Sequence, residues 1–195
     1  MSQPAAFTLS LPTWAISRIA ELPPFLPTAL DRMDLVLEFA RNNVLADTGG
    51  PFAAAVFAKD SGELIAMGVN RVIATGCSSA HAEILAMGLA QQRLGVYDLG
   101  GSGLAAHELV VNWRPCAMCF GALLWSGIRH LTIAGSGPEL EELTGFDEGP
   151  VHPLWREELA RRGISLTEDI RRTEAIALFH WFQESGRIVY NARQG

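Results

Sequence analysis

Two short motifs, far apart in the chain, constrain the fold more than any other feature of the sequence. The first is His81-Ala82-Glu83 and the second is Pro115-Cys116-Ala117-Met118-Cys119. Zinc binds imidazole and thiolate ligands tetrahedrally, and a catalytic zinc site supplies three protein ligands and leaves the fourth position to water. His81, Cys116 and Cys119 match that count. We therefore expect a fold that brings two distant segments of the chain to one zinc ion.

The local sequence around both motifs indicates helix starts. Pro115 favours the beginning of a helix whose first turn holds both cysteines, where the helix dipole stabilises thiolates. Zinc lowers the pKa of a bound water to about 7. Glu83 lies two positions after His81, and at a helix start both side chains can point toward one centre. We predict that Glu83 is the general acid/base and not a zinc ligand.

Apolar periodicity and turn residues predict the order of helices and strands. Segments 52–58 and 64–69 form a hairpin, and segments 108–112 and 131–134 form parallel strands around a helix. Ser78 or Ser79 is the expected cap of the helix that carries His81. The fold class predicted is a three-layer α/β/α domain with a mixed sheet. The expected helices are 13–20, 31–46, 80–94, 116–125, 153–162 and 174–184, and further short strands are expected at 164–167 and 187–190.

Length and composition favour one domain. The chain has 195 residues, of which 49% are hydrophobic, enough for one well-packed core. Residues 1–30 contain five of the ten prolines and are expected to form an N-terminal extension. The single domain predicted then covers 31–195, with the zinc motifs inside 51–150 and the C-terminal helices and tail in 151–195.

Charge and cysteine content bear on partners and location. A net charge of −6 gives no general attraction to a polyphosphate, so we expect no nucleic-acid partner. No apolar run is long enough for a membrane span, so we expect no membrane partner. Three cysteines, two of them in Cys116-Ala-Met-Cys119, fit a reduced compartment better than a disulfide framework. The chain is accordingly expected in the cytoplasm.

Beyond the zinc motifs, residues 51–150 resemble the cytidine deaminase-like superfamily. The His-x-Glu and Pro-Cys-x-x-Cys pair is the known signature of zinc deaminases, and further residues make bacterial guanine deaminases the most similar branch. Ala53 and Arg114 depart from that branch, where many relatives have glycine and glutamate. The residues that carry the resemblance are Pro51-Phe52, Asn70, His81-Ala82-Glu83-Ile84, Pro115–Cys119, Gly121-Ala122, Trp125 and Gly145-Phe146-Asp147-Glu148.

The resemblance implies roles for four more residues. Asn70 and the phenyl ring of Phe52 would hold a nucleobase, and Glu148 would meet its amino edge and help catalysis. Tyr190 lies near the chain end, which in this family can fold over an active site, in some members that of the neighbouring subunit. A homodimer is therefore expected. We assign no chemistry to Cys77, to His107, His130, His152 and His180, or to Trp113 and Phe146, and we interpret Trp125 as a core or interface residue.

The function predicted from these residues is zinc-dependent hydrolytic deamination of a small purine base, most of all guanine to xanthine and ammonia. One alternative within enzymes is tRNA adenosine deamination, which shares the same motifs but expects a basic surface. Another is deamination of cytosine, cytidine or a further amino-heterocycle. A non-enzymatic alternative is an interaction protein with a structural zinc ion, in which the Cys-x-x-Cys pair only supports the fold.

Overall fold

A mixed five-stranded sheet organises the computed structural model, which describes residues 3–193. The strand order is β2-β1-β3-β4-β5, with β1 antiparallel to β2 and β3, and β3, β4 and β5 parallel. This confirms the predicted hairpin and the predicted parallel pair. The strands are β1 (Ala53–Ala58), β2 (Leu64–Val69), β3 (His107–Val111), β4 (His130–Ile133) and β5 (Ser165–Thr167).

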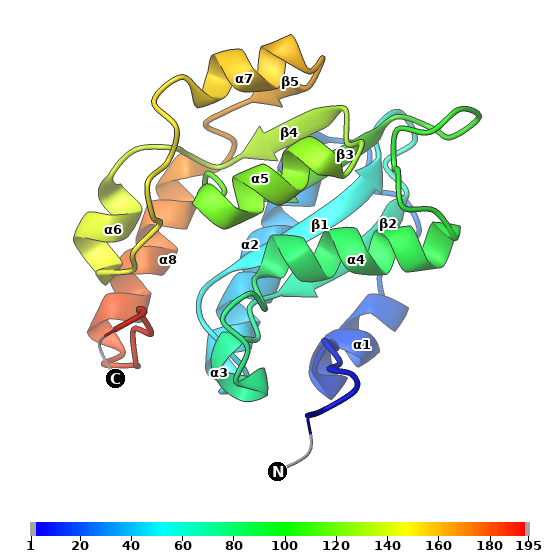
Figure 1. Cartoon of the computed structure of the whole chain (residues 1–195). Coiled ribbons are helices and arrows are strands. Elements are labelled where there is room, and N and C mark those ends of the chain that lie inside the picture. Colours follow the sequence, from blue (N-terminus) through cyan, green and yellow to red (C-terminus); the bar gives the residue numbers. More distant parts are fainter. Residues whose placement is uncertain (1–2, 194–195) are drawn as a thin grey trace.

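Helices cover both faces of the sheet (Figure 1). Helices α4 (Ala82–Leu94) and α5 (Ala117–Trp125) pack on one face, and α2 (Ala29–Leu45) and α8 (Arg172–Glu184) pack on the other. Every residue of β1 is buried because its side chains alternate between the two cores. The structure therefore confirms the three-layer α/β/α fold with a mixed sheet.

Smaller elements surround these layers. Helix α6 (Glu139–Thr144) contacts α8, and α7 (Trp155–Arg161) contacts the edge strand β5. Helix α3 (Val72–Thr75) is a single turn that the sequence pattern did not indicate. No helix within residues 3–193 combines the length and apolar character that a membrane crossing requires.

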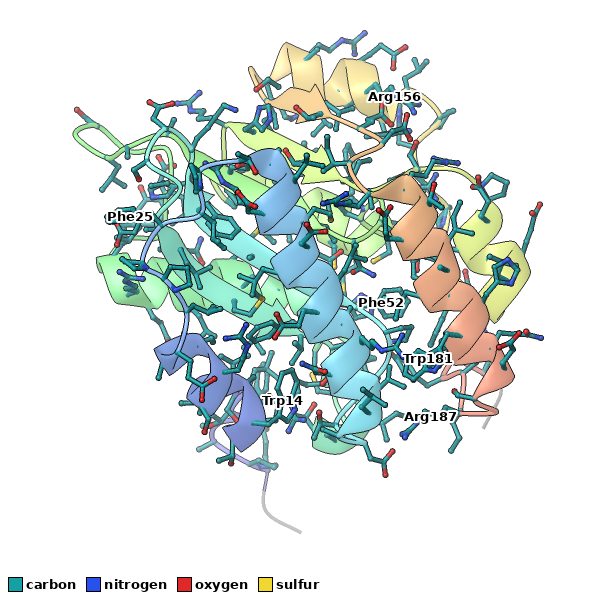
Figure 2. All side chains as sticks on the ribbon, turned by 180° about the vertical axis from the view of Figure 1, so that it is seen from behind. Trp14, Phe25, Phe52, Arg156, Trp181 and Arg187 are labelled. Carbon is teal, nitrogen blue, oxygen red and sulfur yellow. The ribbon has the colours of Figure 1, made fainter. Side chains whose placement is uncertain are left out.

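The N-terminal part packs beside α2, as the view from behind shows (Figure 2). Helix α1 (Thr13–Ala20) has the predicted bounds, its Ala15 is fully buried, and Trp14 packs on Phe39 of α2 with ring centroids 5.3 Å apart. The buried Arg32 side chain donates hydrogen bonds to the carbonyls of Leu26 and Pro27 and forms an ion pair with Glu108. These contacts join the segment before α2 to the sheet.

Two sequence predictions about element ends were wrong. Neither Ser78 nor Ser79 caps the helix that carries the first motif, because α4 begins at Ala82 and His81 occupies the N-cap position. Residues 187–190 form no strand; the sheet already ends at β2 and β5, and Val189 and Tyr190 instead pack in a cluster with Phe182 of α8. The C-terminal part therefore stays irregular up to residue 193, and Gln194 and Gly195 lie outside the described residues.

Candidate active site

The two motifs meet where α4 and α5 begin, because His81 and Cys116 are the N-cap residues of these helices and Cys119 lies in the first turn of α5. The potential ligand atoms of His81, Cys116 and Cys119 all lie within 4.8 Å of one another. Both helix N-termini thus point toward one small volume, where their dipoles favour anionic sulfur. The predicted convergence of the two segments is confirmed.

The geometry of these three side chains fits zinc. The Nδ1 atom of His81 lies 3.6 Å from the Sγ atom of Cys116. Bond lengths of about 2.0–2.1 Å to nitrogen and 2.3 Å to sulfur give a tetrahedral N to S separation of about 3.6 Å. One imidazole and two thiols are also the donor types that zinc prefers. The chain's own residues can therefore hold the ion with little rearrangement.

The pKa values of the two thiols also favour a bound divalent cation. Hydrogen bonds from Cys119 and His81 lower the pKa of Cys116 to about 4, against the effect of burial. The hydrogen bond to Cys116, together with burial and the charge of Glu83, raises the pKa of Cys119 well above its ordinary value. Two adjacent buried thiolates are costly without a compensating charge, and a divalent cation between them supplies it.

Glu83 lies in the first turn of α4 and is buried beside the ligand cluster without belonging to it. Burial and the negative charge of Cys116 raise the pKa of Glu83 above its ordinary value. A buried carboxyl group with a raised pKa holds a proton more readily than an exposed one. Glu83 therefore lies where the predicted acid/base would have to lie, next to the three potential zinc ligands.

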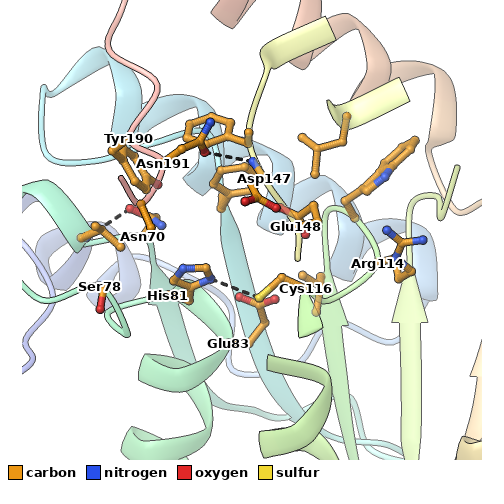
Figure 3. A pocket seen from close by; sticks show the side chains of 17 residues that line it. Asn70, Ser78, His81, Glu83, Arg114, Cys116, Asp147, Glu148, Tyr190 and Asn191 are labelled. Carbon is orange, nitrogen blue, oxygen red and sulfur yellow. Dashed lines mark hydrogen bonds between the residues drawn. The ribbon is translucent and has the colours of Figure 1, made fainter. Parts of the chain in front are cut away.

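A pocket of about 200 Å³ opens above these residues and also contains the other four side chains singled out from the sequence (Figure 3). Its walls include Phe52, Asn70, Glu148 and Tyr190. We call His81, Glu83, Cys116 and Cys119 the zinc floor. We call residues 145–149 and 187–193 the roof; Asp147 and Glu148 of the first segment and Tyr190 and Asn191 of the second lie above the floor in Figure 3.

Asn70 follows β2 and is buried, with only 1% of its surface exposed. Its Oδ1 atom accepts a hydrogen bond from the backbone N–H of Val72 at 3.2 Å, so it closes the turn after the strand. This fixes the amide, whose Nδ2 donor remains available to the pocket. Gly49 makes the arrangement possible, since a Cβ there would lie 1.9 Å from the Asn70 carbonyl oxygen.

An aromatic cluster forms one side of the pocket. Phe52 lies edge-on to Phe146 at a centroid distance of 5.0 Å, and Phe146 contacts Tyr190 in the same way, also at 5.0 Å. Phe52 is half-buried and faces the pocket, where its ring offers an apolar surface to a flat heterocycle. Phe146 and Trp113, assigned only to packing from the sequence, are buried and also line the pocket.

Glu148 stands on the roof opposite Glu83. Its backbone N–H donates to Glu141 and its carbonyl accepts from Ala117, which ties this loop to the start of α5. Burial, followed by the negative charges of Cys116 and Glu83, raises the pKa of Glu148 to about 8. Its carboxyl group thus lines a pocket that already contains acidic side chains. A ligand that donates hydrogen bonds to this carboxyl group would stabilise its ionised form.

Tyr190 lies on the roof beside the Glu148 loop. Burial and the nearby Glu148 and Glu83 raise the pKa of its phenol well above its ordinary value. Its hydroxyl group is buried without a hydrogen-bond partner within residues 3–193. Gly50 allows this close approach, because a Cβ at that position would lie 2.6 Å from the hydroxyl oxygen. The orphaned hydroxyl is a polar group suited to a bound ligand.

Several residues assigned no chemistry have clear structural roles. His107 is buried and bonds the carbonyl of Leu99, and His130 is buried against Ser165 and Thr167. Trp125 is not a core residue: it ends α5 with 88% of its surface exposed. Sequence reasoning also missed pocket residues that carry no motif of their own, namely Val72, Ser78, Val111, Leu140 and Ala192.

Comparison with known proteins places this site in a family. Residues 28–134 match the cytidine and deoxycytidylate deaminase zinc-binding region. The chain belongs to this family of hydrolytic deaminases, whose cofactor is zinc.

Among these deaminases, a guanine deaminase of known structure is similar to nearly the whole chain. The guanine deaminase NE0047 of Nitrosomonas europaea superposes with a TM-score of 0.88 and 45% identity over 94% of this chain and 100% of that one. NE0047 in complex with 2,6-diaminopurine gives a TM-score of 0.88 and 47% identity over 96% and 98% of the two chains.

Two curated relatives are similar over shorter stretches. The guanine deaminase of Bacillus subtilis is 35% identical over 113 residues, which are 58% of this chain and 67% of the relative. The tRNA-specific adenosine deaminase of Buchnera aphidicola is 35% identical over 80 residues, which are 41% of this chain and 50% of the relative.

Proposed function

We propose that this protein is a zinc-dependent guanine deaminase that hydrolyses guanine to xanthine and ammonia. The observation that carries the proposal is the position of Glu148, a carboxyl group that lines the same pocket as Glu83 and two of the expected zinc ligands, His81 and Cys116. Guanine presents N1–H and the 2-amino group along one edge, and an ionised carboxylate accepts two such hydrogen bonds side by side. The negative charges that raise the pKa of Glu148 would be offset by a zinc ion at the floor, which favours this ionised form. Cytosine and adenine lack this paired donor edge in their common tautomers.

The remaining walls fit the rest of a purine. The Asn70 amide donates to a ring nitrogen or carbonyl oxygen, and Phe52 stacks against the ring. The Tyr190 hydroxyl offers a further hydrogen bond from the roof. With the base held between Glu148 and Asn70, its C2 atom faces the floor that contains His81, Cys116 and Cys119.

The chain's residues supply the proton transfers. Zinc, when bound, activates the attacking water. Glu83 takes a proton from that water as the C2–O bond forms, and delivers it to a ring nitrogen. Glu83 then takes the remaining proton from the new C2 hydroxyl and, assisted by Glu148, delivers it to the amino group. The C2–N bond breaks, the C2 carbonyl of xanthine forms, and ammonia leaves. One water is consumed, and one xanthine and one ammonia are formed.

NE0047 has been crystallised with 2,6-diaminopurine, and a substituted variant of it with 8-azaguanine; both ligands carry a 2-amino group. That the relative accepts these ligands supports a small purine base as the partner of this chain. The rival substrate, adenosine in tRNA, is supported by a relative that matches less of the chain. The net charge of −6 and the acidic α6 beside the pocket also disfavour an RNA backbone.

A panel of amino-bearing heterocycles tests the proposal. Ammonia release is measured with guanine, adenine, cytosine, their nucleosides and their nucleotides, using zinc-loaded protein. We expect turnover of guanine to exceed that of every other compound. Faster ammonia release from cytosine or cytidine than from guanine would mean that the substrate is a pyrimidine. Zinc binding without ammonia release from any compound would favour an interaction protein with a structural zinc ion.

Metal content gives a second test that does not depend on the substrate. We expect one zinc per chain by elemental analysis, because the three donors converge from two helix starts. The double variant with Cys116→Ser and Cys119→Ser should bind little zinc. Full retention of zinc in that variant would contradict the ligand assignment.

We also propose a homodimer formed through the outer face of α4 and α5. Met118 and Trp125 of α5 are exposed. A Cβ built at Gly121 of α5 or at Gly88 of α4 would meet nothing within 4 Å, so both helices also present small, uncovered residues. An exposed patch of large apolar side chains next to small residues is suited to a helix pair from a second copy. Sedimentation analysis should show a dimer for the wild type and a monomer for Trp125→Glu.

Residues 31–195 are proposed to form the single deaminase domain, with 1–30 as its N-terminal extension. Its proposed location is the cytoplasm, since Cys77, Cys116 and Cys119 are free thiols.

A further inference from the structure

The side chain of Asn191 bridges two parts of the roof. Its Oδ1 atom accepts a hydrogen bond from the backbone N–H of Asp147 at 2.9 Å, and its Nδ2 atom donates to the carbonyl of Gly145 at 2.7 Å. The first of these bonds appears as a dashed line in Figure 3. One amide thus clamps the backbone on both sides of Phe146.

The clamped segment leads directly into Glu148. Gly145 has a φ of +76°, and Gly149 has a φ of +70°, so both ends of the loop adopt backbone conformations that favour glycine. Between them, the Oδ1 atom of Asp147 accepts from the backbone N–H of Gly149 at 2.8 Å. The loop is a short turn whose orientation sets the direction of the Glu148 side chain.

The backbone of Glu148 bonds to Glu141 and Ala117 on one side of this turn. The C-terminal segment contacts its other side through ring packing and the Asn191 amide. The neighbouring Tyr190 ring packs on Phe146, and Phe146 in turn packs on Phe182 of α8 at a centroid distance of 5.6 Å. Ring contacts of this kind tolerate sliding, whereas a two-point amide clamp fixes both distance and direction. The clamp is therefore the part of the C-terminal segment that best determines where the loop lies.

We infer that Asn191 is a positioning residue for the deamination reaction: its amide sets the Glu148 loop, so that the C-terminal segment and Glu148 reach their working positions together. Asn191 itself does not transfer a proton. A C-terminal segment that only excluded water would need no directional bond to residues 145–147. This inference adds a positioning residue to the proposed function, and its kinetic test rests on that function.

Amide hydrogen exchange tests the clamp without any substrate. The N–H of Asp147 is measured in the zinc-loaded wild type and in Asn191→Ala. Losing one backbone hydrogen bond should accelerate its exchange by about tenfold. Unchanged exchange at Asp147 would overturn the inference, whatever the protein deaminates.

A double-mutant cycle tests the coupling to Glu148. Asn191→Ala should lower kcat for guanine by roughly 10- to 100-fold with a smaller change in KM, as expected for a displaced catalytic group. In the Glu148→Gln background the same change should lower kcat by about twofold or less, because the residue that Asn191 positions is already disabled. Zinc content and Tm should match those of the parent proteins.

Arg187→Ala is the matched control. Arg187 anchors the start of the same segment through Asp47 at 2.6 Å and does not touch the Glu148 loop. Its effect on kcat, whatever the size, should be the same in the wild-type background and in the Glu148→Gln background. An equal effect of Asn191→Ala in both backgrounds would overturn the positioning role. Absence of guanine turnover by the wild type would instead reject guanine as the substrate, and exchange at Asp147 would still decide the clamp.

Discussion

The zinc floor and the roof are built in different ways although they face the same pocket. The floor rests on the N-termini of α4 and α5, and Glu83, Cys116 and Cys119 are all buried. The roof consists of irregular segments, and a few side-chain contacts such as those of Asn191 hold it in place. Rigid helix ends suit the chemistry that all zinc deaminases share, and adjustable loops suit the choice of substrate.

The largest expected effect lies in the floor. Glu83→Gln preserves the shape of the side chain but removes its ability to take up a proton, so kcat for guanine should fall by about 10³-fold. Zinc content and Tm should stay close to wild type. Activity within about tenfold of wild type would show that Glu83 is not the acid/base, since such groups contribute typically 10²–10⁴-fold.

Glu148→Gln is the corresponding substitution in the roof. The variant keeps an acceptor oxygen but loses the charge and the second acceptor, so we expect kcat for guanine to fall by about 10²-fold. Kinetics and zinc content should be measured on one preparation. Wild-type turnover with this variant would mean that Glu148 is a solvated acid and that guanine selection lies elsewhere.

Removal of Tyr190–Gly195 should lower kcat by roughly 10- to 100-fold, at least as much as Asn191→Ala, by admitting water and releasing the Glu148 loop. The free energy of unfolding should fall mainly by the loss of the Tyr190 ring contact with Phe146, because Asn191 is only partly buried and Ala192 is exposed. Kinetics and urea unfolding of the truncated chain measure both quantities. If unfolding changed strongly while kcat did not, the segment would belong to the fold and not to the roof of the site.

The raised pKa of Glu148 predicts the smallest effect, on stability. Its pKa is about 8 in the folded chain and near the ordinary value of 4.5 when unfolded, so between these pH values the folded state binds more protons. Stability from this group is therefore complete below about pH 4.5 and is lost as pH rises toward 8. In zinc-depleted protein, Glu148→Gln should raise Tm relative to wild type at pH 8 but not at pH 5. An equal difference at both pH values would contradict a buried carboxyl group.

The same contrast explains what the sequence could predict. The ligands and Glu83 were found because zinc chemistry requires particular residue types at helix starts, and the strands because apolar runs end at turn residues. The start of α4 was misplaced because backbone bonds in the preceding loop, such as Arg71 to Ala80, define it better than Ser78 or Ser79 do. For Trp125 the sequence left a core and an interface position open, because the apolar residues of a helix do not show which of them neighbouring elements leave exposed; the structure excludes the core position.

The roof could be predicted only in part. Glu148 and Tyr190 were singled out by resemblance, and both line the pocket. The strand expected at 187–190 has apolar residues of strand type, but pairing requires a free sheet edge nearby, and no local pattern reveals where the edges lie. The hydrogen bonds of Asn191 join positions far apart in the chain and follow only from the folded backbone.

The most direct test of the account compares two substrates on one zinc-loaded preparation. Values of kcat/KM are measured for free guanine, by xanthine formation with ammonia as a check, and for a tRNA anticodon stem-loop with adenosine, by inosine formation. The account predicts stoichiometric xanthine and ammonia from guanine and no inosine in the RNA. Inosine in the RNA with guanine left intact would contradict it.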